Sequence, residues 1–179
     1  MRRTGSLGVV VALFLLVHPG VPGAQEETRR CDGATATIVG TAGNDQLTGT
    51  SGDDVIVGLG GNDDIQTSGG TDRVCGNRGS DVIVRTEDTD PADPDIGRFF
   101  GGRGADRAEG GNSPNDQQVF DTLHGGPGND QVLGHGGNDQ VYGNAGMDTL
   151  NGGEGHDYVD GGPGDDTCAE GEYYVSCRH

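Results

Sequence analysis

Residues 125–169 read GGPGNDQVL GHGGNDQVY GNAGMDTLN GGEGHDYVD GGPGDDTCA, which is five consecutive blocks of nine residues. Each block opens with glycine, carries aspartate in sixth place, and has an apolar residue or cysteine in eighth place. Residues 40–84 divide in the same way into GTAGNDQLT GTSGDDVIV GLGGNDDIQ TSGGTDRVC GNRGSDVIV. A short fixed period is typical of solenoids built from stacked units, so the chain is a repeat protein.

The two halves of a block have different local preferences. The first six residues are rich in Gly, Asn and Asp, which favour turns, and Asn or Asp in fifth place can also adopt positive φ. The last three residues suit a short strand whose middle residue points inward and whose neighbours point outward. Stacked blocks would therefore bury a thin continuous core that no single block could form.

Two blocks make one coil, so residues 18 apart share an edge, and successive coils lie about 4.7–4.9 Å apart. The pattern predicts an all-β solenoid with sixth-place aspartates stacked along its edges. Two pairs of stacks are expected: Asp45, Asp63 and Asp81 opposite Asp54 and Asp72, then Asp121, Asp139 and Asp157 opposite Asp130, Asp148 and Asp166.

Acidic residues dominate the charge. The chain of 179 residues has 29 Asp and Glu against 11 basic residues, all of them Arg, and a net charge of −18. Such a chain repels phosphate, which argues against nucleic acid as a partner. Apolar residues are too few for an ordinary hydrophobic core. Cations are therefore the expected partners.

Stacked carboxylates repel one another unless a cation lies between them. Aspartates and turn carbonyls are hard oxygen ligands, which suit Ca²⁺ better than Mg²⁺ or Zn²⁺. Seven aspartate pairs are 18 residues apart, so about seven Ca²⁺ sites are expected. The candidate ligands are Asp45, Asp54, Asp63, Asp72, Asp81, Asp106, Asp121, Asp130, Asp139, Asp148, Asp157 and Asp166. The alternative is a metal-free β-solenoid in which these aspartates only cap turns.

The blocks resemble the glycine-rich nonapeptide G-G-x-G-x-D-x-U-x of RTX (hemolysin-type) calcium-binding proteins. The resemblance covers about residues 40–84 and 101–168, and the layout is similar to that of small secreted RTX-repeat proteins of actinobacteria. It implies a parallel β-roll with Ca²⁺ held between successive turns of one edge by the aspartates and turn carbonyls. Many blocks depart from the motif by having only one leading glycine, as in Gly40-Thr41.

Residues 1–24 have the layout of a cleavable signal peptide. Arg2 and Arg3 precede an apolar run at 7–17 and small residues at 21–24. The run is shorter than the roughly 20 residues that span a bilayer, so the mature protein is expected to be secreted, without a membrane span.

Five further segments are expected. Residues 25–39 form a linker and a degenerate capping repeat, 40–84 and 101–168 form the two repeat regions, and 169–179 form a C-terminal cap. The acidic, proline-containing insertion at 85–100 either splits the roll in two or bulges from a single roll. It is interpreted as a linker whose aromatic end packs on the roll, or as a partner-binding loop.

Four cysteines in an exported chain suggest two disulfides, with three possible pairings. Cys168–Cys177 would clamp the tail over the open end of the roll. Cys31–Cys75 then follows by elimination, but it requires the segment around Cys31 to fold back along the roll, because five blocks separate the two cysteines.

The predicted function is that of a secreted calcium-binding protein that folds when calcium binds. Each aspartate is one of a dozen equivalents, and no catalytic constellation is recognisable, so no enzyme activity is predicted. The alternative is an adhesion, matrix or accessory module in which calcium is only structural. Binding through the loop at 85–100 would favour adhesion, and a glycan array would test carbohydrate binding.

Overall fold

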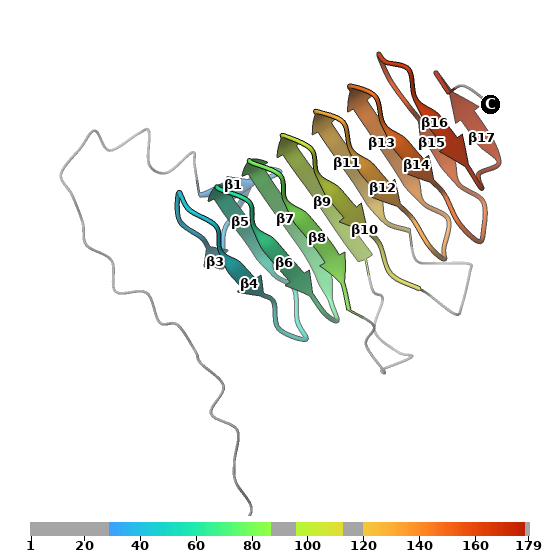
Figure 1. Ribbon diagram of the computed structural model, residues 1–179. Helices are drawn as coiled ribbons and strands as arrows, with labels where there is room; N and C mark the ends of the chain where they lie inside the picture. The colour runs from blue at the N-terminus through green and yellow to red at the C-terminus, as the bar shows by residue number, and fades with distance from the viewer. Residues whose placement is uncertain (1–28, 87–95, 113–119, 178–179) are drawn as a thin grey trace, which may run out of the picture.

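The computed structural model describes residues 29–86, 96–112 and 120–177, and within them the fold is a parallel β-roll (Figure 1). The expected signal peptide lies outside the described residues. One sheet has the strand order β16-β14-β12-β10-β8-β6-β4. Its strands are β4 (Gln46–Thr48), β6 (Asp64–Thr67), β8 (Val82–Arg85), β10 (Arg107–Glu109), β12 (Gln131–Leu133), β14 (Thr149–Asn151) and β16 (Thr167–Ala169).

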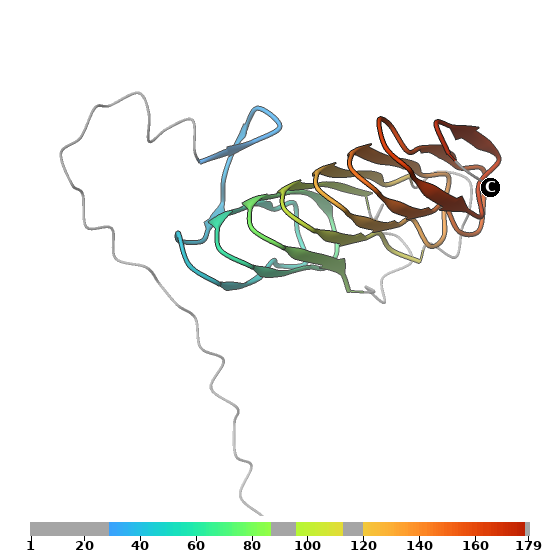
Figure 2. The ribbon, with the colours of Figure 1, turned by 45° about the horizontal axis from the view of Figure 1, so that its top comes forward.

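The second sheet faces the first across the thin interior of the roll (Figure 2). Its order is β17-β15-β13-β11-β9-β7-β5-β3. Its strands are β3 (Ile38–Val39), β5 (Val55–Gly60), β7 (Thr71–Arg78), β9 (Ile96–Arg103), β11 (Thr122–Pro127), β13 (Gln140–Ala145), β15 (Tyr158–Asp160) and β17 (Tyr173–Val175). The chain alternates between the sheets, so two blocks make one coil. Within the described ranges no helix has the length and hydropathy of a membrane span.

The roll continues across both irregular regions. Ile65 pairs with Ile83 at the regular spacing, Ile83 then pairs with Ala108, and Ala108 pairs with Val132. In the sequence, the extra residues fall between β8 and β9 and between β10 and β11, two successive connections from the first sheet to the second. The structure is therefore one roll and not two. Residues 96–100, expected to belong to the insertion, instead begin β9, which pairs with β7.

One inward side chain per block forms the core, as the period predicts. The fully buried members include Ile56, Ile65, Val74, Ile83, Leu123, Val132, Val141 and Val159. Phe99 and Ala108, both buried, occupy the two core positions of the same coil, one in each sheet. The large ring of Phe99 thus accompanies the smallest core side chain, which explains how Ala108 is tolerated there.

An antiparallel hairpin, β1 (Arg30–Cys31) and β2 (Ala34–Thr35), lies against the outer face of the second sheet (Figure 2). Its two-residue loop is Asp32-Gly33, both with positive φ, which suits a tight hairpin turn. Cys31 is buried and joined to Cys75 of β7, and Asp32 forms an ion pair with Arg98 over 2.6 Å. The segment does fold back along the roll, so the expected pairing is confirmed.

At the opposite end, β17 adds a final strand to β15. Cys168 at the end of the core is bonded to Cys177, the other expected disulfide. Tyr174 packs against the last core residues, and its hydroxyl accepts a hydrogen bond from the amide of Gly171. These contacts cover the open end of the roll, where exposed strand edges would otherwise invite association.

Candidate metal centre in two columns of buried aspartates

The twelve sixth-place aspartates lie in two columns, one along each edge of the roll. Column A is unbroken and contains Asp45, Asp63, Asp81, Asp106, Asp130, Asp148 and Asp166. Column B contains Asp54 and Asp72, then Gly97 in place of aspartate, then Asp121, Asp139 and Asp157. The two pairs of stacks expected from the sequence are therefore the two ends of the same two columns.

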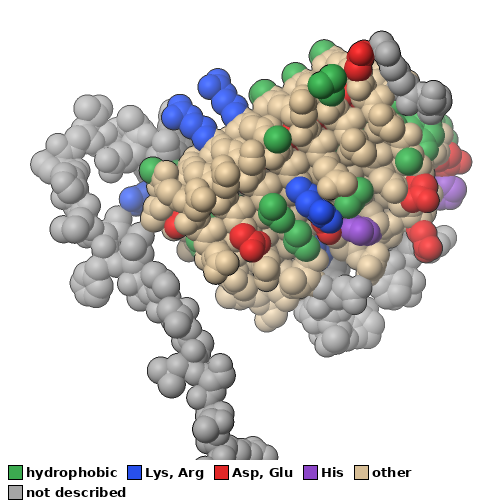
Figure 3. Space-filling model, in the orientation of Figure 1, with side chains coloured by type: hydrophobic (Ala, Val, Ile, Leu, Met, Phe, Trp, Pro, Cys, Tyr) green, Lys and Arg blue, Asp and Glu red, His purple; other side chains and the backbone are tan. Residues whose placement is uncertain are grey.

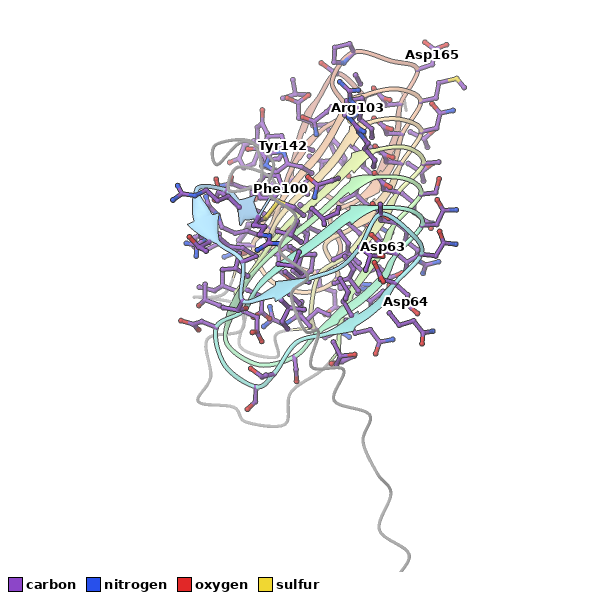
Figure 4. The ribbon with its side chains drawn as sticks, turned by 90° about the vertical axis from the view of Figure 1, so that its left-hand side faces the viewer. Asp63, Asp64, Phe100, Arg103, Tyr142 and Asp165 are labelled. Atoms are coloured by element: carbon purple, nitrogen blue, oxygen red, sulfur yellow. A yellow bond between two sulfur atoms is a disulfide. The ribbon has the colours of Figure 1, made fainter. Side chains whose placement is uncertain are left out.

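The column aspartates point inward because they are two residues before the core residue of their block, the spacing that keeps side chains on one face of an extended segment. Eleven of the twelve are buried, and Asp45 at the N-terminal end is half-buried. Figure 4 shows Asp63 among the stacked turns, whereas Phe100 and Tyr142 lie together on the other side of the roll. Acidic side chains are accordingly sparse on the face seen in Figure 3, despite the 29 in the chain.

In every column carboxylate after Asp45 and Asp54, one oxygen joins neighbouring coils. The Oδ1 atom of Asp81 accepts a hydrogen bond of 2.9 Å from the backbone amide of Asp63, and Oδ1 of Asp139 accepts one of 2.8 Å from the amide of Asp121. The same bond recurs along both columns. This bond fixes the carboxylate in the turn and leaves its second oxygen, Oδ2, beside the first-place residue of the same block.

Most of the second oxygens have no hydrogen-bond partner among the described residues. In the described part of the chain, nine buried Oδ2 atoms have no hydrogen-bond partner. They belong to Asp63, Asp72, Asp81, Asp106, Asp130, Asp139, Asp148, Asp157 and Asp166. A buried carboxylate oxygen without a partner is costly, so a repeated row of them requires either protons or cations.

Burial makes the charged form of these carboxylates unfavourable. It raises the pKa of Asp139 to about 8, with the neighbouring carboxylates adding to the rise, and that of Asp130 to about 7. Burial raises the pKa of Asp81 to about 6, and that of Asp72 to about 6 although the nearby Arg85 guanidinium lowers it. Without a cation, the roll therefore favours protonated carboxyl groups.

First-place glycines make room for the orphaned oxygens. A Cβ on Gly76 would lie 2.3 Å from Oδ2 of Asp81 and 2.6 Å from the carbonyl oxygen of Gly101 in the next coil. The same arrangement recurs at Gly58, beside Asp63 and the carbonyl of Gly76. A carboxylate oxygen and a turn carbonyl oxygen thus converge beside each of these glycines. A side chain in place of the glycine would fill the space between the two oxygens.

The fifth-place Asn and Asp residues connect neighbouring coils and do not adopt positive φ. None of them has positive φ; the left-handed residues are mainly in second and fourth place, including Leu59 and Asn77. The Asn62 side chain instead accepts a hydrogen bond of 2.9 Å from the amide of Ser80, 18 residues later. Asn and Asp in fifth place therefore form a second ladder between coils, outside the carboxylate columns.

Threonine in second place closes the first carboxylate of each column. The amide of Thr41 donates to Oδ2 of Asp45 over 2.6 Å, and its hydroxyl does so over 2.9 Å. Thr50 makes the same two bonds to Asp54. In the two blocks with a single leading glycine, threonine replaces the second glycine and hydrogen-bonds the Oδ2 atom, so these two Oδ2 atoms differ from the nine that have no partner.

The structure shows two further pairs of neighbouring column aspartates that are not 18 residues apart in the sequence. Asp81 and Asp106 are neighbours although 25 residues apart, and Asp106 and Asp130 are neighbours although 24 apart. The insertions hid both contacts. Counting the length of each insertion against the repeat period would have revealed them.

The donor set suits a hard cation. No group of three or more His, Cys, Asp or Glu side chains could hold a metal within residues 29–86, 96–112 and 120–177. A cation in a column would therefore take one or two carboxylates and complete its shell with turn carbonyls, such as that of Gly76. Such all-oxygen, irregular shells suit Ca²⁺.

The sequence comparison agrees with this chemistry. The family described as RTX calcium-binding nonapeptide repeat matches in four copies, over residues 33–65, 48–83, 120–150 and 134–168. Together they cover 100 of the 179 residues, and the chain belongs to this family. No curated protein matches the chain significantly. RTX repeats bind Ca²⁺, so the roll is a calcium-binding structure.

Proposed function

We propose that this is a secreted protein whose roll folds when calcium binds, with the column aspartates as side-chain ligands. The observation that carries the proposal is the row of nine buried Oδ2 atoms without partners in the described coils. Ca²⁺ would neutralise them, and the turn carbonyls beside the first-place glycines would supply the remaining oxygens.

The energetic argument concerns the metal-free state. A net charge of −18 and a thin core disfavour the compact form when the columns carry no cation. A ligand that binds only the folded form stabilises it by mass action, and each bound ion adds to that effect. Calcium therefore acts as a folding ligand, and a binding role fits twelve near-equivalent aspartates better than catalysis does.

Secretion fits the cysteine chemistry. All four cysteines are in disulfides, which persist in oxidising compartments and are rare in the cytosol. The calcium-poor cytosol would leave the chain unfolded, and outside the cell sites with a dissociation constant of about 10⁻⁴–10⁻³ M would fill. The sequence layout of residues 1–24 is consistent with this route.

The test is a calcium titration of the oxidised protein followed by circular dichroism, with EGTA reversal. We expect a cooperative gain of strand signal at millimolar or lower calcium, lost again in EGTA. Magnesium at the same concentration is the control and should produce much less strand. An unchanged strand signal in EGTA would overturn calcium-coupled folding.

A further inference from the structure

The third turn of column B departs from the repeat at two positions. Arg85 pairs with Thr67 in the β6–β8 register and so stands in first place. Gly97 pairs with Asp72 in the β7–β9 register and so stands in sixth place. The other first-place residues of this column are small: Gly49, Thr67, Gly110, Gly134 and Gly152. This turn alone in the described columns combines a long first residue with a missing carboxylate.

The two departures compensate each other in volume. In a regular turn of column B, a Cβ on Gly134 would lie 2.6 Å from Oδ2 of Asp139. With Gly97 in sixth place that carboxylate is absent, and the Arg85 side chain has room to enter. Gly97 is itself required by the core, because a Cβ there would lie 2.8 Å from the ring of Phe99.

The Arg85 guanidinium lies between two coils. The residue is 6% exposed, and its Nη1 is 3.6 Å from Oδ1 of Asp121 in the next coil. Its Nη2 donates to the carbonyl oxygens of Ser68 and Gly70 in the previous coil, over 3.3 Å and 3.2 Å. The side chain passes over Gly111, where a Cβ would lie 2.6 Å from its Cδ.

We infer that Arg85 is a built-in cation that takes the place of a calcium ion in column B. The oxygens that it faces include one column carboxylate and two turn carbonyls, the same oxygen classes that the other turns offer to calcium. Column B is then divided into two separate calcium segments, Asp54–Asp72 and Asp121–Asp157. The guanidinium also holds these coils together without metal, because its charge is permanent. This inference rests on the proposed calcium role.

The first test counts calcium ions per chain by equilibrium dialysis and metal analysis. Arg85→Gly restores the small first-place residue and should bind one more calcium than the wild type at saturation. Arg103→Ala is the matched control, because it removes an exposed arginine at the other edge and should leave the count unchanged. An unchanged count in folded Arg85→Gly would overturn the inference, whereas a wild type that binds no calcium would overturn the proposed function.

A second test does not depend on the extra ion. In calcium, Arg85→Met removes the guanidinium that faces Asp121 and should lower the thermal midpoint of unfolding. Adding Asp121→Asn to Arg85→Met should cost at least about tenfold less in the folding equilibrium constant than the same change costs the wild type, because the guanidinium that this carboxylate faces is already absent. The same Asp121→Asn in the wild-type background should be destabilising. Additive effects of the two substitutions would contradict a direct pairing.

Discussion

The amide of Asp81 donates a hydrogen bond to the carboxylate of Asp106 over 2.8 Å, although the two residues are 25 positions apart. Asp106 in turn binds the carboxylate of Asp130 through its own amide. Asp106 therefore connects the two repeat regions into the single column A, and its substitution tests whether the column acts as a unit.

Replacing Asp106 by Asn should affect two neighbouring candidate sites, because its carboxylate lies between those of Asp81 and Asp130. We expect loss of at least one bound calcium and about a tenfold rise in the calcium midpoint, since a charge-assisted contact contributes about 1.5–3 kcal/mol. Asp64→Asn is the control, because Asp64 is outside the columns. Equal effects of the two substitutions would argue against a special role for column carboxylates.

The first-place glycines should not tolerate a methyl group. Gly76→Ala would bring a Cβ within 2.3 Å of Oδ2 of Asp81, so we expect weaker calcium binding and a loss of about 1–3 kcal/mol in stability. In Gly52→Ala the nearest atom lies 3.9 Å away, and that variant should behave like the wild type. Calcium titrations of both variants by circular dichroism decide the matter, and a tolerant Gly76→Ala would contradict the proposed geometry.

The metal-free roll should become less stable as the pH rises. Burial raises the folded-state pKa of column aspartates from 3.8 to about 6 for Asp81 and about 8 for Asp139. Between the unfolded pKa and these folded pKa values, the folded chain therefore binds more protons than the unfolded chain. That contribution to stability is complete below the unfolded pKa and is lost as the pH rises through the folded pKa.

Circular dichroism of the calcium-free protein should therefore show more strand at about pH 5 than at about pH 8.5. Saturating calcium should abolish or reverse this order, because the ion takes over the neutralising role of the protons. If the stability of the metal-free roll increased toward alkaline pH, ionisation of the column carboxyl groups would not destabilise the fold, and the prediction would be wrong.

The two disulfides should contribute unequally. Chain entropy alone predicts about 4 kcal/mol for the loop of 44 residues closed by Cys31–Cys75 and about 3 kcal/mol for the loop of 9 closed by Cys168–Cys177. Paired Cys→Ala variants should both raise the calcium midpoint, the first by more. Identical midpoints with and without the bonds, measured in the same titration, would show that calcium alone determines folding.

The period of nine predicted a stacked β-solenoid with two edges, and the resemblance to RTX repeats implied the parallel β-roll. Phe99 was assigned to the insertion, whose aromatic end packs on the roll in one of the two interpretations, and its effect on Gly97 was not predicted. That effect depends on a ring reaching a neighbouring turn, which no local pattern expresses. The exchange of Arg85 and Gly97 was hidden for a second reason: the insertion separates two residues that the repeat would place five apart.

The threonine bonds at Asp45 have a consequence for the ends of the roll. Every later carboxylate of column A accepts a hydrogen bond from an amide of the coil before it, whereas Asp45 is the first column A carboxylate in the described residues and accepts hydrogen bonds from Thr41. The assembly consequently has a head and a tail that are not interchangeable. A roll shortened from its N-terminus to begin at Gly58 would have Leu59 in second place. Leu59 has no hydroxyl, so it could not donate the side-chain hydrogen bond that Thr41 donates to Asp45.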